Sequence, residues 1–115
     1  MLKTLTVQLK PELLGDRLSN KAVQLLEALA NTQKLMSHFK VLKGAENEKY
    51  INVNFECVDL LNLWASIKES FLTKNPLSPM LKKGAIIICQ GENGWEDYLL
   101  LYHYDASIQL DELDE

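Results

Sequence analysis

Hydrophobic and polar residues alternate along the first segment of the chain. Over residues 3–9, Leu5, Val7 and Leu9 recur with period two between threonine and glutamine side chains. This spacing is typical of a strand with one buried face. Pro11 lacks the N–H that a strand ladder needs, so we expect the strand to end before it.

The pattern then changes to a helical period. Apolar residues at spacings of three and four form a stripe that predicts an amphipathic helix starting near Asp16 and ending within residues 32–36. A second stripe predicts a helix that Asp59 caps and that ends before Pro76, because the residue before a proline avoids helical geometry. The first stripe comprises Leu18, Ala22, Leu25, Leu26, Leu29 and Ala30, and the second Leu60, Leu61, Trp64, Ile67, Phe71 and Leu72.

Two further strands are predicted between these helices. Residues 37–43 and 50–56 flank a charged segment without large apolar side chains, which favours a hairpin with a loop of five or six residues. In the second strand Ile51, Val53 and Phe55 alternate with asparagine and glutamate. Asparagine is a poor strand former, so we expect the asparagine face to be solvated.

The last predicted element is a second hairpin. Residues 85–89 and 98–104 are apolar on both faces, which favours interior strands. Asn93-Gly94 between them is the preferred pair for a type I′ turn, since both central residues need positive φ. Such a turn would place Ile88 opposite Leu99, and the Leu99 face would then meet the helices.

The predicted order is β-α-β-β-α-β-β in a single α+β domain spanning residues 1–115, with an acidic tail over 106–115 that we expect to be frayed. Two helices on one face of an antiparallel sheet match the ferredoxin-like, or split β-α-β, pattern. A related α/β two-layer sandwich with another strand order is the alternative. The expected core comprises Leu25, Leu29, Ile51, Val53, Phe55, Leu60, Trp64, Ile67, Ile86, Ile88, Leu99 and Leu101.

Charge is distributed unevenly along the chain. The formal net charge is −4, but residues 1–57 carry eight Lys or Arg against six Asp or Glu, and residues 58–115 carry four against ten. After Lys83 there is no basic residue other than histidine. An acidic surface repels phosphate groups, so we expect neither nucleic acid nor an anionic membrane as a partner. A basic protein is compatible with this charge.

Three features that the sequence lacks indicate the cellular compartment of the protein. No apolar run approaches the roughly 18 residues of a membrane span. The first ten residues alternate and do not resemble a signal peptide. Cys57 and Cys89 are too few for a disulfide framework and lie in no CxxC motif, which favours free thiols. We therefore expect a cytoplasmic protein.

Catalytic chemistry has little support in the sequence. His38 and His103 are the only histidines, and no pattern pairs either of them with a nucleophile. Cys57 precedes a predicted helix, whose N-terminus lowers a thiol pKa, but two neighbouring acidic residues oppose that effect. The acidic residues around 92–97 match no calcium-binding loop, and no glycine-rich nucleotide motif is present. We expect no catalytic residue, no metal and no cofactor.

Aromatic and acidic residues concentrate in the last hairpin. By strict alternation, Tyr98, Tyr102 and Tyr104 share one face of its second strand with Leu100. Tyrosine and tryptophan are enriched at protein interfaces because they combine apolar area with a polar tip. The alternative is that the tail covers this face through Ile108, Leu110 and Leu113. The candidate partner-binding residues are Trp95, Glu96, Asp97, Tyr98, Tyr102, Tyr104 and Asp105.

The sequence thus predicts a non-enzymatic protein-binding module. One form is an acidic inhibitor or immunity-type protein that binds a basic partner, and self-association through the tyrosine face is another. A small-molecule sensor, with its ligand between the sheet and residues 75–83, is the alternative from a different class. A small enzyme that uses Cys57 or His103 is the third hypothesis.

Overall fold

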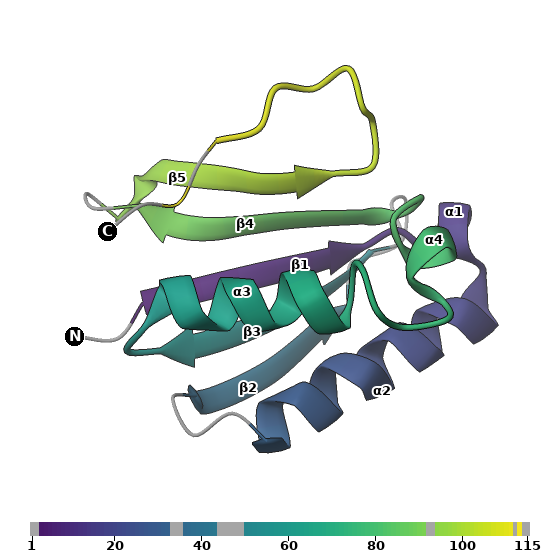
Figure 1. Ribbon diagram of the computed structural model, residues 1–115, viewed down its shortest axis with the longest axis horizontal. Helices are drawn as coiled ribbons and strands as arrows, with labels where there is room; N and C mark the ends of the chain where they lie inside the picture. The colour runs from purple at the N-terminus through teal and green to yellow at the C-terminus, as the bar shows by residue number, and fades with distance from the viewer. Residues whose placement is uncertain (1–2, 33–35, 44–49, 92–93, 112, 114–115) are drawn as a thin grey trace.

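The computed structural model describes residues 3–32, 36–43, 50–91, 94–111 and 113. Within these residues the strands form one sheet and the helices cover one side of it (Figure 1). In chain order the elements are β1 (Lys3–Leu9), α1 (Pro11–Leu14), α2 (Asp16–Thr32), β2 (Met36–Lys43), β3 (Ile51–Cys57), α3 (Leu60–Ser70), α4 (Ser78–Leu81), β4 (Ala85–Gly91) and β5 (Gly94–His103).

The strand order confirms the predicted fold class. The sheet has the order β2-β3-β1-β4-β5, and each neighbouring pair is antiparallel. β3 lies between β1 and β2, which α2 connects, and β1 lies between β3 and β4, which α3 connects. Each β-α-β unit is therefore split by a strand of the other, as in ferredoxin-like folds, and β5 extends the sheet beyond β4.

One face of this sheet forms the core. β1 is central, and its alternating apolar residues are fully buried between those of β3 and β4. α2 contributes Ala22 and Leu26 to the layer above, and α3 contributes Leu63 and Ile67. The three strands supply Leu5, Val7, Leu9, Ile51, Val53, Phe55, Cys57, Ala85, Ile87 and Cys89.

The predicted core is confirmed for α3 and β3, holds only in part for α2, and is wrong in β4. Leu101 is buried as expected, while Leu25, Leu29 and Leu99 are half-buried against the core. Ile86 and Ile88, which we expected in the core, lie on the opposite face, because Ile87 pairs with the buried Val7 of β1. β4 is apolar on both faces, so its own pattern could not decide which face is buried.

The hairpin between β4 and β5 also differs from the prediction. Gly91 pairs with Gly94, so Gly94 belongs to β5 and the predicted Asn93-Gly94 turn is misplaced. Residue 93 itself lies outside the described residues. A Cβ atom on Gly91 would collide with the backbone carbonyl oxygen of Asp97. Gly91 therefore allows the main chain of β5 to cross closely over the end of β4.

An irregularity in β5 splits the predicted tyrosine stripe. Leu100 pairs with Ile88, but Tyr102 pairs with Ile87, so one extra residue of β5 lies between these two pairs. Such a bulge moves every later residue to the other face of the sheet. Tyr102 consequently shares the core face with Ile87, and the expectation that all three tyrosines share one face is wrong.

The helix ends and corners depend on specific contacts. Asp59 caps α3 as predicted, since its Oδ1 accepts a hydrogen bond from the Asn62 N–H at 3.1 Å. At the opposite end of the sheet, the Lys10 N–H donates to the Gly84 carbonyl at 2.8 Å. A Cβ on Gly84 would lie 2.6 Å from Cγ of Leu14, so only glycine lets α1 approach β4 this closely.

The segment after β5 returns to the free edge of that strand. The N–H of Asp111 donates to the carbonyl of Leu100 at 2.8 Å, and Oδ2 of Asp111 accepts from the N–H of Leu100 at 2.8 Å. Leu113 is partly buried against the core, whereas Ile108 and Leu110 are exposed. Asp111 thereby imitates one residue pair of a further strand.

Candidate functional site

One face of the sheet is turned away from α2 and α3 (Figure 1). We call it the outer face. None of the described helices packs on it, because the core residues of α2 and α3 all contact the other side. By strand alternation it comprises Thr4, Thr6 and Gln8 of β1, Asn52, Asn54 and Glu56 of β3, Ile86, Ile88 and Gln90 of β4, and Tyr98, Leu100 and His103 of β5.

One half of the outer face, on β1 and β3, is polar. The Thr6 hydroxyl donates a hydrogen bond to Oδ1 of Asn54 at 2.6 Å, and Thr6 is 7% exposed. Gln90, at the end of β4, accepts from the Thr4 N–H at 3.3 Å. These bonds join side chains across neighbouring strands, and the face of β3 that we expect to be solvated is half-buried at Asn52, Asn54 and Glu56.

The other half of the outer face, on β4 and β5, is apolar. We call Ile86, Ile88, Tyr98 and Leu100 the apolar strip. Ile88 and Leu100 are directly paired across the two strands, and Ile86 is two residues further along β4. Tyr98 is 55% exposed, and the other three are half-buried. Water therefore reaches a continuous apolar strip on a sheet face that the described helices do not cover.

The predicted partner-binding residues do not form one cluster. Asp97, Tyr98, Tyr104 and Asp105 are exposed, but six residues of extended chain, roughly 20 Å, separate Tyr98 from Tyr104. The side chains of Trp95 and Glu96 lie outside the described part of the chain. Tyr98 is the predicted residue that the structure places on the apolar strip.

Tyr102 stabilises the fold and does not line the outer face. Its hydroxyl donates to the carbonyl of Lys82 at 2.7 Å, and its ring packs partly against the core. Partial burial raises the pKa of its phenol above the usual value. This side chain therefore joins β5 to the segment after α4, and a partner docked on the outer face would not contact it.

His103, Tyr104 and Asp105 form a local turn at the end of β5. The His103 and Tyr104 rings are 4.6 Å apart, and Nδ1 of His103 accepts from the Asp105 N–H at 3.0 Å. Oδ1 of Asp105 accepts from the N–H of Ser107 at 3.0 Å and from its hydroxyl at 2.7 Å. The hydroxyl bond is the main reason that the pKa of Asp105 lies below its usual value. Both His103 and Asp105 are thus engaged in shaping this turn.

The two thiols are buried and unreactive in this environment. Cys57 and Cys89 are free and fully buried, and burial raises the pKa of each to about 11, with the charge of Asp59 adding to the effect at Cys57. β1 lies between them, so their Cα atoms are on the order of 10 Å apart, too far for a disulfide. This arrangement gives no support to thiol chemistry at Cys57.

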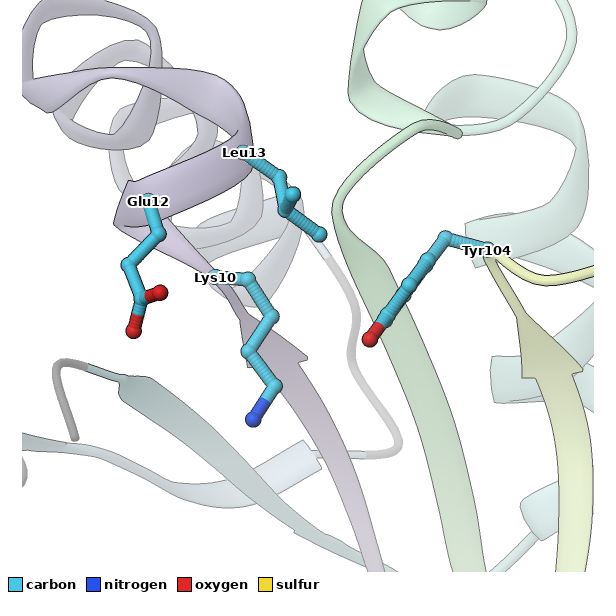
Figure 2. A pocket seen from close by; sticks show the side chains of 4 residues that line it. All are labelled: Lys10, Glu12, Leu13 and Tyr104. Carbon is cyan, nitrogen blue, oxygen red and sulfur yellow. The ribbon is translucent and has the colours of Figure 1, made fainter.

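A hollow of about 240 Å³ lies at one end of the sheet. Figure 2 shows Lys10 extending from the end of β1, Glu12 and Leu13 from α1, and Tyr104 from beyond β5, with β4 passing between the two sides. The hollow does not lie between the sheet and residues 75–83, where a sensor is expected to hold its ligand. In that segment Ser78 is 1% exposed, and its hydroxyl donates to the carbonyl of Phe71 at 2.8 Å, which ties α4 to the core.

Among the described residues, no group of three or more His, Cys, Asp or Glu side chains is placed to hold a metal ion. No described helix combines the length and apolar character required to cross a bilayer. Comparison with protein-family models, with curated proteins and with solved structures found no match.

Sequence reasoning misses most of the apolar strip. The pattern predicts Ile86 and Ile88 in the core and identifies Leu100 only as a neighbour of the tyrosines. The polar residues of β1 and β3 carried a usable signal, because pairing these strands with β4 forces its outer residues onto the same solvated face. That signal depends on strand order, which the amino-acid pattern of β4 does not contain.

Proposed function

We propose that this protein is a non-enzymatic protein-binding module that docks another protein on its outer face. The observation that carries the proposal is the apolar strip of Ile86, Ile88, Tyr98 and Leu100 on the side without described helices. An exposed apolar strip on a folded domain is a hallmark of interaction surfaces. Partial exposure of these side chains leaves apolar area for a partner to bury.

The shape of the outer face favours a protein over a small molecule. Five strands spaced by about 4.8 Å and seven residues of about 3.3 Å each give a face of roughly 500 Å². A specific protein interface buries at least about 500 Å² per partner, which matches the area of this face. Small-molecule sites are concave and enclose most of their ligand, whereas a sheet face is broad and shallow.

A non-enzymatic role is supported by the state of the reactive groups. The raised pKa values of Cys57 and Cys89 keep both thiols protonated near neutral pH. His103 holds a turn through its Nδ1 atom. The side chain of His38 lies outside the described part of the chain and contributes nothing to this argument.

Charge at the edge of β5 bears on the type of partner. Asp97, Asp105 and Asp111 lie along or beside this strand, and no lysine or arginine follows Lys83 in the sequence. These carboxylates would steer a basic protein toward the apolar strip, as in an acidic inhibitor or immunity-type protein. Self-association through the outer face is the second form of the same function.

The test makes the two paired residues at the middle of the apolar strip polar. In the double variant Ile88→Thr and Leu100→Thr, two apolar side chains become polar, and threonine retains a good strand propensity at both positions. Met80→Thr, at an exposed apolar residue of α4 outside the outer face, is the matched control. Each protein is checked for native circular dichroism, immobilised and exposed to cell lysate, and the pure proteins are compared by sedimentation.

We expect at least one specific association, with a lysate protein or with a second copy, that Met80→Thr retains and the double variant loses by tenfold or more. The proposal is wrong if the wild type associates with nothing, or if every association survives in the double variant.

A further inference from the structure

We infer that the occupant of the outer face is a second copy of this chain, docked face to face, an inference that rests on the proposed function. The two-fold axis lies between the two sheets and runs across their strands. Under this operation each strand lies over its own copy and runs in the opposite direction. Three features of the outer face are complementary to themselves under this one axis.

The first feature is the separation of the outer face into two halves. The apolar strip lies on β4 and β5, and the polar half lies on β1 and β3. Because each strand faces its own copy, apolar residues meet apolar residues and polar residues meet polar residues. An axis parallel to the strands would instead bring the apolar strip over the opposite side of the sheet. That arrangement would bury part of the strip against polar residues, which costs free energy.

The second feature is the position of the two isoleucines. Ile88 pairs with Thr6 and Ile86 pairs with Gln8, so the two lie one residue to either side of Val7 along the sheet. Reversing the strand direction about Val7 places Ile86 of one copy opposite Ile88 of the other. The contact occurs twice, as a two-fold interface requires. The same operation places Thr6 opposite Gln8, so polar residues face polar residues across the polar half.

The third feature is charge at the two ends of the polar half. Glu56 pairs with Thr4 at one end of the sheet. Lys10 follows the buried Leu9, continues in extended geometry and lies at the other end. The axis through Val7 places Lys10 of one copy over Thr4 of the other, next to its Glu56. Sheets pack about 10 Å apart, a gap that lysine and glutamate side chains can bridge together.

The small area and the like net charges both favour a weak dimer. A face of roughly 500 Å² per copy gives about 1,000 Å² in total, which is at the lower limit for a specific interface. Each copy also carries a net charge of −4, so the two copies repel each other at long range. We therefore expect a reversible dimer with a Kd of about 1–100 µM rather than an obligate one.

The test exchanges the charges at the two ends. Sedimentation equilibrium of the pure full-length protein should show a monomer–dimer equilibrium. Glu56→Lys should raise Kd by about tenfold, because it places two like charges together twice in the dimer. Lys10→Glu should do the same from the other end. The variant with both exchanges, Glu56→Lys and Lys10→Glu, should return Kd to within about threefold of the wild type.

Two controls separate charge pairing from changes in net charge and from unfolding. Glu27→Lys changes the net charge as Glu56→Lys does, but Glu27 is an exposed residue of α2 on the helical side, so Kd should change less than twofold. Circular dichroism and thermal unfolding check that each variant folds. If one end cannot be exchanged without unfolding, the single exchange at the other end still tests the pair.

The outcomes separate this inference from the proposed function. A monomer at every concentration, an effect of Glu56→Lys no larger than that of Glu27→Lys, or no recovery in the doubly exchanged variant would overturn the dimer. If the protein is monomeric but a lysate protein binds the wild type and not the Ile88→Thr, Leu100→Thr variant, protein binding stands and the occupant is heterologous. Loss of both observations would overturn both proposals.

Discussion

β3 and β4 flank the central strand β1 symmetrically, and their burial patterns are identical along seven residues. On the core side both present fully or nearly fully buried apolar residues to the helices. On the outer side they differ at two positions, since β3 carries Asn52 and Asn54 where β4 carries Ile86 and Ile88. A strand on the other side of β1 therefore carries polar residues at the corresponding positions, so pairing with β1 does not by itself require isoleucine at the outer positions of β4.

Phe55→Ala against Asn54→Ala tests the two sides within β3. Phe55 is fully buried, and its truncation should cost about 3–5 kcal/mol, because the transfer free energy of the ring is lost and a cavity is left in the core. Asn54→Ala removes one hydrogen bond with Thr6 and should cost about 1 kcal/mol. Urea unfolding monitored by tryptophan fluorescence measures both, and equal losses would mean that the two sides are not distinct.

Ile87→Thr against Ile88→Thr makes the same comparison within β4. At the fully buried Ile87, threonine places a hydroxyl in the core and should cost about 2–3 kcal/mol. At the half-buried Ile88 the same change should cost less than about 1 kcal/mol. Chemical unfolding of the two variants at a concentration where the protein is monomeric decides between them. A larger loss at Ile88 would reverse the assignment of the faces.

Gly91→Ala tests the crossing of β5 over β4. The added methyl group would collide with the carbonyl of Asp97, so the backbone must move, at a cost of about 1–3 kcal/mol. Gly15→Ala is a useful contrast, since a Cβ there meets no atom within 4 Å but the residue has a φ of 84°. Thermal unfolding measures the stability loss of each variant. Changes in the NMR chemical shifts of amide groups in the β4–β5 hairpin should accompany Gly91→Ala and not Gly15→Ala.

The two thiols on either side of β1 give a pH dependence. Their pKa in the folded protein is about 11, above the ordinary value of 9.0, so the unfolded chain loses these protons first. Stability from this source is complete below pH 9 and is lost as the pH rises toward 11. At pH 9.5 the loss should be about 1–2 kcal/mol for the pair.

The double variant Cys57→Ala and Cys89→Ala serves as the reference. Its free energy of unfolding should fall less steeply between pH 8 and 10 than that of the wild type. A thiol reagent at pH 8 should label neither cysteine in the native protein and both after denaturation. If the free energy of unfolding falls with pH equally steeply in both proteins, the thiols do not have the raised pKa that burial gives them.

Asp111→Ala should have the smallest effect. It removes the carboxylate that accepts from the Leu100 N–H but keeps the backbone bond, and should cost about 0.5–1 kcal/mol. Asp111→Asn keeps an oxygen acceptor and should restore most of that loss. Hydrogen exchange at Leu100 reports on the bond directly, and unchanged protection in Asp111→Ala would show that the side chain contributes nothing.

Much of this fold follows from period and register in the sequence. Alternation in β1 and β3, two helical stripes and the cap at Asp59 each predict their element because one face of each is apolar and the other is polar. The same reasoning fails in β4, where Ile86, Ile87 and Ile88 are chemically equivalent. Only the pairing of β4 with β1, distant in the sequence, selects the buried face.

The candidate surface was predicted less well, for a related reason. Strict alternation places Tyr98, Tyr102 and Tyr104 on one face, but the extra residue in β5 near Leu101 breaks the period. A bulge leaves no reliable mark in a run such as Leu99-Leu100-Leu101, since any of the three can be accommodated on either face. The steric requirement at Gly91 is likewise visible only once the backbone of Asp97 is placed against it.

The central position of β1 has a consequence for the way in which this chain folds. β1 precedes β2, β3 and β4 in the chain, but it pairs with β4, and Thr4 bonds to Gln90 across 86 positions of sequence. Closing so large a loop costs entropy before any contact compensates for it, and folds dominated by such distant pairings form slowly. During synthesis, β1 to β3 and both long helices are complete before β4 emerges. The backbone N–H and C=O groups on the β4 side of β1 therefore stay unpaired until then. We expect refolding in milliseconds to seconds, with β4 and β5 the last strands to gain protection.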